Sequence, residues 1–232
     1  MMAAARCATA RAAAAHAADS DGVPSLTQSY HHGDLRAALM TQTLALVASD
    51  QAHRIGFREL ARLLKVSRTA PYRHFASVDA LLAAVASEGF SAFLVALDAA
   101  LQSVKGGARD SFLELGVAYI EFALQKPAHY RLMFDQKFYK KTDFPEVGVL
   151  AAKAFALLKA TVAACLPKDA TDQQKVEIAS LAWACVHGLA KLMIDGQLAT
   201  KGNPQEKRRF VRSSCQRLLA LVGTYNLSEK SI

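Results

Sequence analysis

The stretch FRELARLLKVSRTAPYRHF, from Phe57 to Phe75, combines two short amphipathic segments with a tight turn between them. In the first, residues 57–64, apolar side chains recur at helical spacing and arginines fall on the opposite face. Lys65-Val66-Ser67 forms the turn. A second short helix is expected from about Arg68 to Phe75, where Pro71 is tolerated because proline fits the first turn of a helix. This pattern predicts a helix-turn-helix.

A helix-turn-helix places the first residues of its second helix at base edges in the major groove. Residues 51–75 carry six basic side chains against one acidic side chain, and phosphate neutralisation supplies much of the affinity for DNA. Solvated helix faces could also produce such a charge pattern. The candidate DNA-contacting residues are Arg58, Lys65, Ser67, Arg68, Thr69, Ala70, Pro71, Tyr72, Arg73, His74 and Ser77.

From Asp34 almost to its end the chain has apolar residues at three- and four-residue spacing, which predicts an all-α fold. Glycine and proline residues mark most of the breaks. Besides the two short helices, we expect a first helix at 34–49, a long one that Ser77 caps, and further helices at 111–124, 128–135, 147–165, 172–198 and 205–222, with a charged loop at 137–145.

The motifs YHHGDLR (30–36), RELA (58–61) and APYRHF (70–75) lie within a segment from Tyr30 to Phe90 that resembles the N-terminal DNA-binding domain of the TetR family of transcriptional regulators. KPAHYRLMF (126–134) and AWACVHGLAKL (182–192) resemble the C-terminal domain type named for its Trp-His-Gly signature, here Trp183, His187 and Gly188. The resemblance implies three DNA-binding helices, a linking fourth helix, and a helical body for ligand binding and dimerisation. The expected divisions are a mobile Ala/Arg-rich tail at 1–28, a DNA-binding domain at 29–78 with its helix-turn-helix at about 56–75, and an effector-binding and dimerisation domain at 79–225.

Two positions depart from the family pattern. The turn residue before Val66, usually glycine, is Lys65, and a left-handed backbone there would cost about 1 kcal/mol. At the start of the fourth helix, where the family often has a phosphate-contacting lysine, this chain has Val78. We therefore expect a slightly altered turn and one phosphate contact fewer.

The tail has alanine at eleven of its first eighteen positions, together with Arg6 and Arg11. A mobile extension is expected, with an organellar transit peptide as the competing interpretation. Whether the tail reaches the minor groove of DNA is left open.

The family's body implies a pocket for a small-molecule effector, and its lining is expected from the large aromatic and apolar residues, although most of these will simply be core. An apolar, neutral or weakly polar effector is expected. The candidate ligand-binding residues are Phe93, Phe112, Tyr119, Phe122, Tyr130, Met133, Phe134, Trp183 and His187, of which His187 is more often a hydrogen-bonded core residue in such a setting. The candidate dimer interface comprises Trp183, Val186, Ala190, Met193, Phe210, Leu218 and Leu221.

Composition and motifs narrow the remaining functions. The 52% share of hydrophobic residues excludes disorder of the whole chain, and the net charge of +8 suits a polyanion partner. The four cysteines form no CxxC pair, no catalytic motif is recognisable, and charged or polar residues interrupt every apolar run. We therefore expect no enzyme, metal, cofactor or membrane span. A cytoplasmic, nucleoid-associated, homodimeric repressor that releases a palindromic operator on binding its effector is the favoured function, and a nonspecific DNA-binding architectural protein is the alternative.

Overall fold

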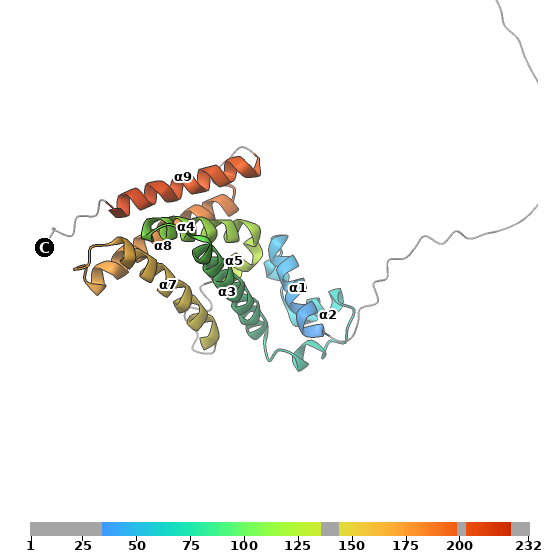
Figure 1. Ribbon diagram of the computed structural model, residues 1–232. Coiled ribbons are helices and arrows are strands. Elements are labelled where there is room, and N and C mark those ends of the chain that lie inside the picture. Colours follow the sequence, from blue (N-terminus) through green and yellow to red (C-terminus); the bar gives the residue numbers. More distant parts are fainter. Residues whose placement is uncertain (1–33, 136–143, 199–202, 224–232) are drawn as a thin grey trace, which may run out of the picture. The chain divides into compact units, whose positions relative to one another are not determined.

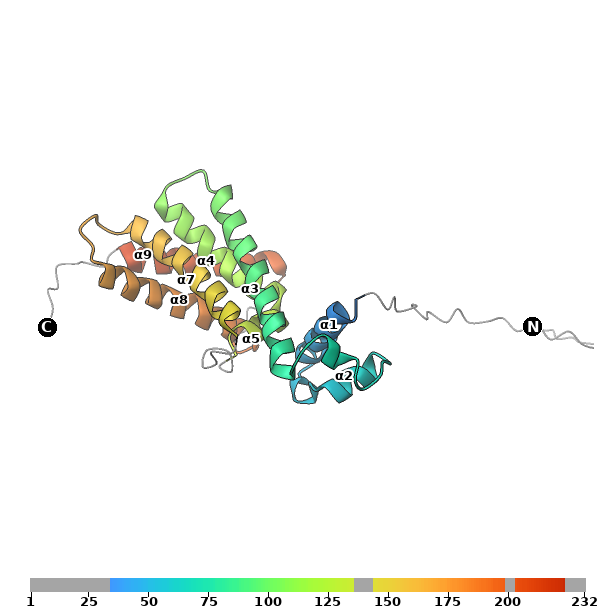
Figure 2. The ribbon, with the colours of Figure 1, turned by 90° about the horizontal axis from the view of Figure 1, so that it is seen from below.

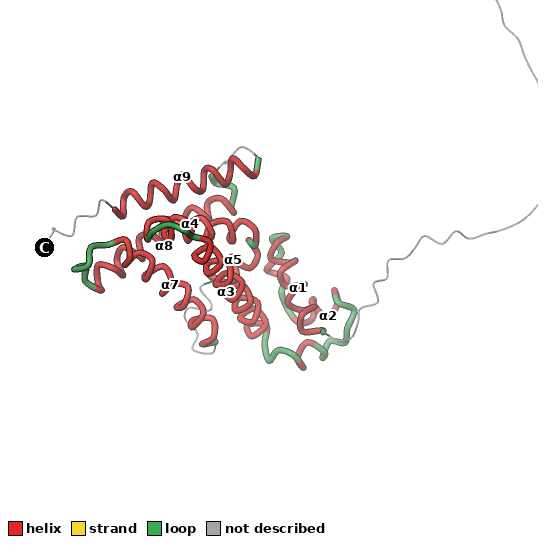
Figure 3. Tube along the Cα trace, in the orientation of Figure 1, coloured by secondary structure: helices red, strands yellow, loops and turns green. Residues whose placement is uncertain are grey.

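A computed structural model describes residues 34–135, 144–198 and 203–223 of the chain, and in those ranges the secondary structure is helical, with no strand (Figures 1 and 3). The all-α prediction is therefore confirmed. The helices are α1 (Leu35–Ala48), α2 (Phe57–Leu63), α3 (Val78–Ser103), α4 (Ala108–Gln125), α5 (Pro127–Met133), α7 (Pro145–Cys165), α8 (Asp172–Ile194) and α9 (Pro204–Gly223), with 3₁₀ helices η1 (Ala52–Arg54) and η2 (Pro71–Arg73).

Side-chain caps begin four of these helices, including α9, where Asn203 and Glu206 bond each other reciprocally. Asp34 accepts a hydrogen bond from the backbone N–H of Ala37 at 2.9 Å, and Ser77 accepts one from Ala80 at 3.1 Å. Thr171 and Gln174 form a reciprocal capping box at the start of α8. Each cap satisfies an N–H that has no partner inside its helix, which fixes where α1, α3, α8 and α9 begin.

Three helices end in a Schellman motif. The first residue past the C-cap has a positive φ in each: Asp50 (59°) after α1, Lys65 (55°) after α2 and Gly196 (68°) after α8. In α2, the N–H of Val66 donates to the carbonyl of Ala61 at 3.0 Å, which satisfies a carbonyl at the end of the helix. The turn is therefore not altered as expected: Lys65 itself adopts the left-handed conformation that normally favours glycine.

The long helix α3 is the centre of the packing. It lies against α1, α4, α5 and α7, and α4 in turn lies against α8 and α9 (Figure 2). One buried cluster runs from Leu39 in α1 and Leu60 in α2 through Leu81 and Phe93 in α3 to Ile120 in α4. Because the cluster is continuous, the short helices within Phe57–Phe75 share one core with α3 and α4.

Three helices, α3, α7 and α8, are long and apolar enough to cross a membrane by length and composition. The expectation that interrupting polar residues exclude such helices is wrong on this point, because isolated charges such as Asp79 and Asp98 leave α3 strongly apolar. In α3 the apolar side chains of Leu81 and Phe90 are buried between helices. Packing inside the protein therefore uses much of this apolarity.

Candidate nucleic-acid interface and apolar cavity

The second helix of the predicted helix-turn-helix is shorter and tighter than expected. The prediction of a helix over 68–75 is corrected to a 3₁₀ helix at Pro71–Arg73 that follows a turn. Arg73 N–H donates to the Ala70 carbonyl at 3.2 Å and His74 N–H donates to the Pro71 carbonyl at 3.0 Å, both across three residues. Pro71, which has no N–H, donates no hydrogen bond to this turn.

Nine of the eleven candidate DNA-contacting residues are exposed; Ala70 is half-buried and Pro71 is buried. Because the Pro71 side chain is buried, it packs inside the protein and is not available at the surface. Tyr72 is 62% exposed, and its ring meets the Phe57 ring edge-on with 4.8 Å between centroids. This contact holds the exposed hydroxyl of Tyr72 beside the start of α2.

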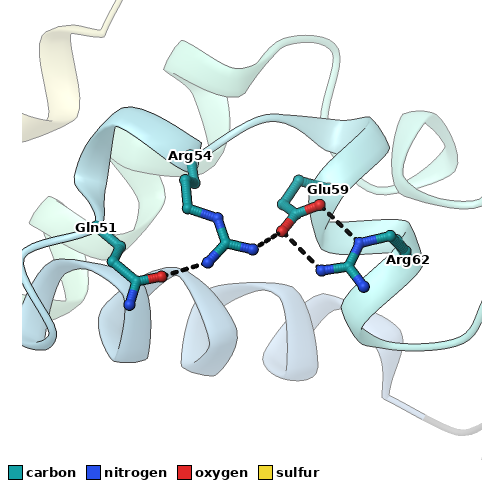
Figure 4. A network of polar contacts seen from close by, with 4 residues as sticks. All are labelled: Gln51, Arg54, Glu59 and Arg62. Atoms are coloured by element: carbon teal, nitrogen blue, oxygen red, sulfur yellow. Dashed lines mark hydrogen bonds and ion pairs between the residues drawn. The ribbon is translucent and has the colours of Figure 1, made fainter.

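An exposed ion-pair network lies on the same segment (Figure 4). Glu59 accepts two hydrogen bonds from Arg62, at 2.8 and 2.9 Å, and another from Arg54, which also bonds Gln51. The pKa of Glu59 is lowered to about 2, mainly by the hydrogen bonds from Arg62 and next by the bond from Arg54. The bond to Glu59 raises the pKa of Arg62. The network joins η1 to α2 and holds two guanidinium groups at the surface, a pairing that the sequence analysis did not identify.

Val78, which stands where the family often has lysine, is half-buried and packs against the core. Its side chain therefore contributes to the packing at the start of α3. The neighbouring Ser77, which caps α3, is exposed.

A cavity of about 290 Å³ lies among α3, α4, α7 and α8, with Phe134 at the end of α5. Its described lining contains no Asp, Glu, Lys, Arg or His side chain. The lining residues are Phe90, Phe93, Leu97, Phe112, Leu115, Gly116, Tyr119, Phe134, Gly148, Ala151, Ala152, Ala154, Phe155, Leu158, Ala182, Trp183 and Val186.

The structure brings five of the nine candidate ligand-binding residues to this cavity: Phe93, Phe112, Tyr119, Phe134 and Trp183. The other four, Phe122, Tyr130, Met133 and His187, are not among the lining residues. Met133 is completely buried, where its side chain packs close to Gly89 of α3. The small residues that open the cavity, such as Gly116 and Ala151, were missed because sequence reasoning sought large side chains.

A polar network lies behind the cavity wall. The Trp183 indole N–H donates to the Tyr119 hydroxyl at 3.2 Å. The hydroxyls of Tyr119 and Tyr130 lie 3.0 Å apart, and they lie 3.0 and 2.8 Å, respectively, from Nδ1 of His187. This network ties α4, α5 and α8 together, and it explains His187 as the hydrogen-bonded core residue that the sequence favoured.

Burial is the main reason why the pKa of His187 lies below its ordinary value of 6.5, and nearby Lys191 lowers it further. At neutral pH the imidazole is therefore uncharged, so Nδ1 can accept a hydrogen bond from a tyrosine hydroxyl. Within the described residues, every buried side-chain nitrogen and oxygen has a hydrogen-bond partner, and no group of three or more His, Cys, Asp or Glu side chains is arranged to hold a metal ion.

The predicted dimer residues divide into inward- and outward-facing sets. Val186 and Ala190 are buried in the protomer's own core, and Trp183 lines the cavity, so these three belong to packing within the chain. Met193 and Leu218 are half-buried. The large apolar residues of these helices that face outward include Val176 (39% exposed), Leu181 (62%) and Leu192 (39%) on α8, and Phe210 (40%) and Leu221 (69%) on α9. The prediction did not include Leu181 and Leu192, because it assumed an apolar face of α8 that packs inside the chain.

This chain is similar to known proteins in both sequence and fold. The family model described as "Tetracyclin repressor-like, C-terminal domain" matches residues 112–218. That description does not carry the Trp-His-Gly name, which stays a prediction. A comparison with curated protein sequences found no match.

Among solved structures, a protein of unknown function from Rhodococcus sp. RHA1 is 30% identical, with a TM-score of 0.67 over 85% of this chain and 100% of that chain. A regulatory protein in the tetR family from Rhodococcus RHA1 is 18% identical, with a TM-score of 0.65 over 82% and 98% of the two chains. A TetR-family transcriptional regulator from Bordetella parapertussis 12822 is 14% identical, with a TM-score of 0.61 over 87% and 100%. The last two likenesses show the fold. With the domain match and the 30% identical relative, they establish that this chain belongs to the TetR family of transcriptional regulators.

Proposed function

We propose that this protein is a sequence-specific DNA-binding repressor that works as a homodimer and releases its operator when a small molecule enters the cavity. One observation carries the proposal. Helix α3, which Ser77 caps, begins at Val78 shortly after the exposed basic segment, and the same helix lines the cavity with Phe90, Phe93 and Leu97. A single rigid element therefore connects the two candidate sites.

In this proposal the exposed residues Arg68, Thr69 and Arg73 read base edges. Arg68 and Arg73 can each donate two hydrogen bonds to a guanine, and Thr69 can contact a thymine methyl. Lys65, Tyr72 and His74 would contact phosphates, which set register without reading sequence. Arg54 and Arg62 join the phosphate-contacting set, because Glu59 holds both at the surface.

Dimerisation would bring two such segments to one duplex. The exposed apolar residues Leu181 and Leu192 of α8, with Phe210 and Leu221 of α9, supply a face that a second copy can cover. Two copies spaced by one helical turn, roughly 34 Å, or a multiple of it, would match a palindromic operator. We propose that the outward apolarity of α8 serves this contact rather than a membrane.

The effector would act by preferring the released conformation, since a ligand shifts an equilibrium only through different affinities for its two states. Helix α5 offers a route besides α3: it contacts α1, and it carries Tyr130 of the network behind the cavity. The proposed divisions are a DNA-binding domain at 29–78 and an effector-binding body at 79–225, in a cytoplasmic protein that needs no cofactor and performs no catalysis.

Nonspecific DNA packaging is the second candidate, favoured by the basic surface alone. The cavity favours regulation instead, because a packaging protein has no use for an effector site.

Binding to a mixed-sequence duplex of about three helical turns, followed by anisotropy over roughly 0.05–0.2 M salt, tests the proposed surface. A mixed-sequence duplex offers no operator, so Arg68 and Arg73 would lie against phosphates there instead of guanines. The double change Arg68→Ala with Arg73→Ala should therefore weaken binding to it and lower the salt slope by about two. Arg109→Ala with Lys159→Ala, which removes the same charge from α4 and α7, is the matched control and should change neither quantity. Equal losses in the two double variants would contradict the assignment of the surface.

A further inference from the structure

The volume of the cavity limits the size of its ligand. An apolar cavity of about 150 Å³ holds a benzene molecule. The present cavity, at about 290 Å³, is nearly twice as large. It therefore has room for two rings of carbon atoms and too little for four.

The chemistry of the wall limits the charge of the ligand. No Asp, Glu, Lys, Arg or His side chain is among the described lining residues, so an ion inside would lose its water without gaining a counter-charge. The polar groups closest to hand, the indole of Trp183 and the hydroxyl of Tyr119, already bond each other. In addition, no buried polar side-chain atom in the described chain lacks a partner. The polar groups of the cavity wall are therefore satisfied without any hydrogen bond from a ligand.

The shape of the space comes from a contrast between its walls. Bulky rings, among them Phe93, Phe112 and Trp183, come from α3, α4 and α8. Helix α7 also contributes Phe155 and Leu158, but the part of α7 before them contributes only small residues, Gly148, Ala151, Ala152 and Ala154. Small side chains on α7 leave the space open opposite the rings. A bulky residue at Ala151 would occupy it.

From these three properties we infer that the effector is an uncharged, mainly hydrocarbon molecule of two-ring size, and that the small residues of α7 set its upper limit of size. This inference rests on the proposed function, because it takes the cavity to be the effector site, and it adds the chemical class of the ligand.

Trp183 makes the test direct, since it is the sole tryptophan of the chain and it lines the cavity. Its emission is measured in the full-length protein, without DNA, during titration with three probes: 2-decalone, decahydro-2-naphthoate and androsterone. These probes are an uncharged two-ring ketone, a two-ring carboxylate and an uncharged four-ring steroid. The two ketones absorb only weakly where tryptophan is excited, and the carboxylate does not absorb there, so a blank titration of free tryptophan corrects for the probes.

We expect a saturable change with 2-decalone, with a Kd on the order of 10 µM. The carboxylate should bind at least about 100-fold more weakly, because its charge must be buried, and the steroid should not bind. Ala151→Phe should weaken 2-decalone binding at least about tenfold by filling the space. Ala164→Phe, the same change at an exposed position of α7 outside the lining, should leave it unchanged.

Carboxylate or steroid affinity within about tenfold of that of 2-decalone would overturn the inference, as would the lack of any saturable change up to about 1 mM 2-decalone. If Ala151→Phe does not fold, the comparison of the three probes on the unaltered protein still decides. Binding of 2-decalone by a protein without sequence-selective DNA binding would contradict the proposed function alone. Selective DNA binding with tight carboxylate binding would contradict the ligand class alone.

Discussion

The indole nitrogen of Trp183 lies 3.2 Å from the hydroxyl oxygen of Tyr119 and donates a hydrogen bond to it across the wall of the cavity. The bond joins α8 to α4, and the contacts of Tyr119 with Tyr130 and His187 extend it to α5. A displacement of the Trp183 side chain would therefore affect hydrogen bonds in α4, α5 and α8 together.

Tyr119→Phe tests the strength of this tie. Removing the hydroxyl leaves the half-buried indole N–H without its acceptor, so the free energy of unfolding should fall by about 1–3 kcal/mol. Urea denaturation followed by Trp183 emission measures the change. Tyr72→Phe removes a hydroxyl from a ring that is 62% exposed and should have almost no effect on stability. Equal stability of Tyr119→Phe and the unaltered protein would show that the bond contributes nothing.

The burial of His187 predicts a pH dependence. Its pKa is below 6.5 in the folded protein and near 6.5 in the unfolded chain, so the unfolded chain binds more protons as the pH falls. The free energy of unfolding contributed by this group should be fully present above about pH 6.5 and should be lost as the pH falls below it toward the folded pKa. Urea midpoints between about pH 7.5 and 5.5 measure the trend.

His187→Gln should flatten that pH trend, because the group that takes up the proton is gone. His53→Gln, at an exposed position, is the control and should keep the trend of the unaltered protein. A trend that survives His187→Gln would assign the pH dependence to another group.

Gly89→Ala tests the close approach of α3 and α5. An added Cβ would lie 2.9 Å from the Cγ and Sδ of Met133 and 3.3 Å from the Cβ of His129. Because Met133 is completely buried, we expect a loss of about 1–3 kcal/mol that outweighs the helix propensity of alanine. Gly148→Ala meets no atom within 4 Å and should instead stabilise α7 by about 0.5–1 kcal/mol. Thermal or urea unfolding measures the free energy of unfolding of both variants. Two changes of the same sign would contradict the prediction.

Lys65→Gly separates a folding cost from a binding benefit. With φ at 55°, Lys65 occupies backbone space that glycine enters freely, so the variant should be more stable by about 1 kcal/mol. If Lys65 contacts a phosphate, the variant should also bind DNA less tightly and show a salt slope lower by about one. Higher stability with unchanged DNA binding would leave the lysine without a role at the DNA.

Leu181→Glu tests the outward face of α8. Placing a charge at this position, which is 62% exposed in the single chain, should weaken self-association at least about tenfold if a second copy covers it. Sedimentation equilibrium measures the change. Val95→Glu makes the same kind of change at a 69% exposed site of α3 and should leave the association intact. Unaltered self-association of Leu181→Glu would place the dimer contact elsewhere.

Local signals in the sequence were sufficient for most helix boundaries. Ser77 caps α3 as expected, α8 begins at the expected Asp172, and the breaks at Gly106-Gly107 and Pro167 fall between helices. The 3₁₀ geometry at Pro71–Arg73 was missed, because proline tolerance in a first turn does not reveal which hydrogen bonds follow.

The cavity and its network depended on distant contacts that no local pattern encodes. Tyr130 and His187 are 57 residues apart, and they meet only because α5 and α8 reach the same point. On α8 the apolar residues surround much of the helix, so periodicity could not tell the inward Val186 and Ala190 from the outward Leu181 and Leu192.

The central claim is that two copies of this chain read a defined DNA sequence. Selection of bound duplexes from a random library by the purified protein, at a salt concentration near 0.15 M, tests it most directly. The account predicts enrichment of a palindrome whose half-sites are spaced by whole helical turns. Retention of DNA without enrichment of any sequence would contradict it and would favour the nonspecific packaging role.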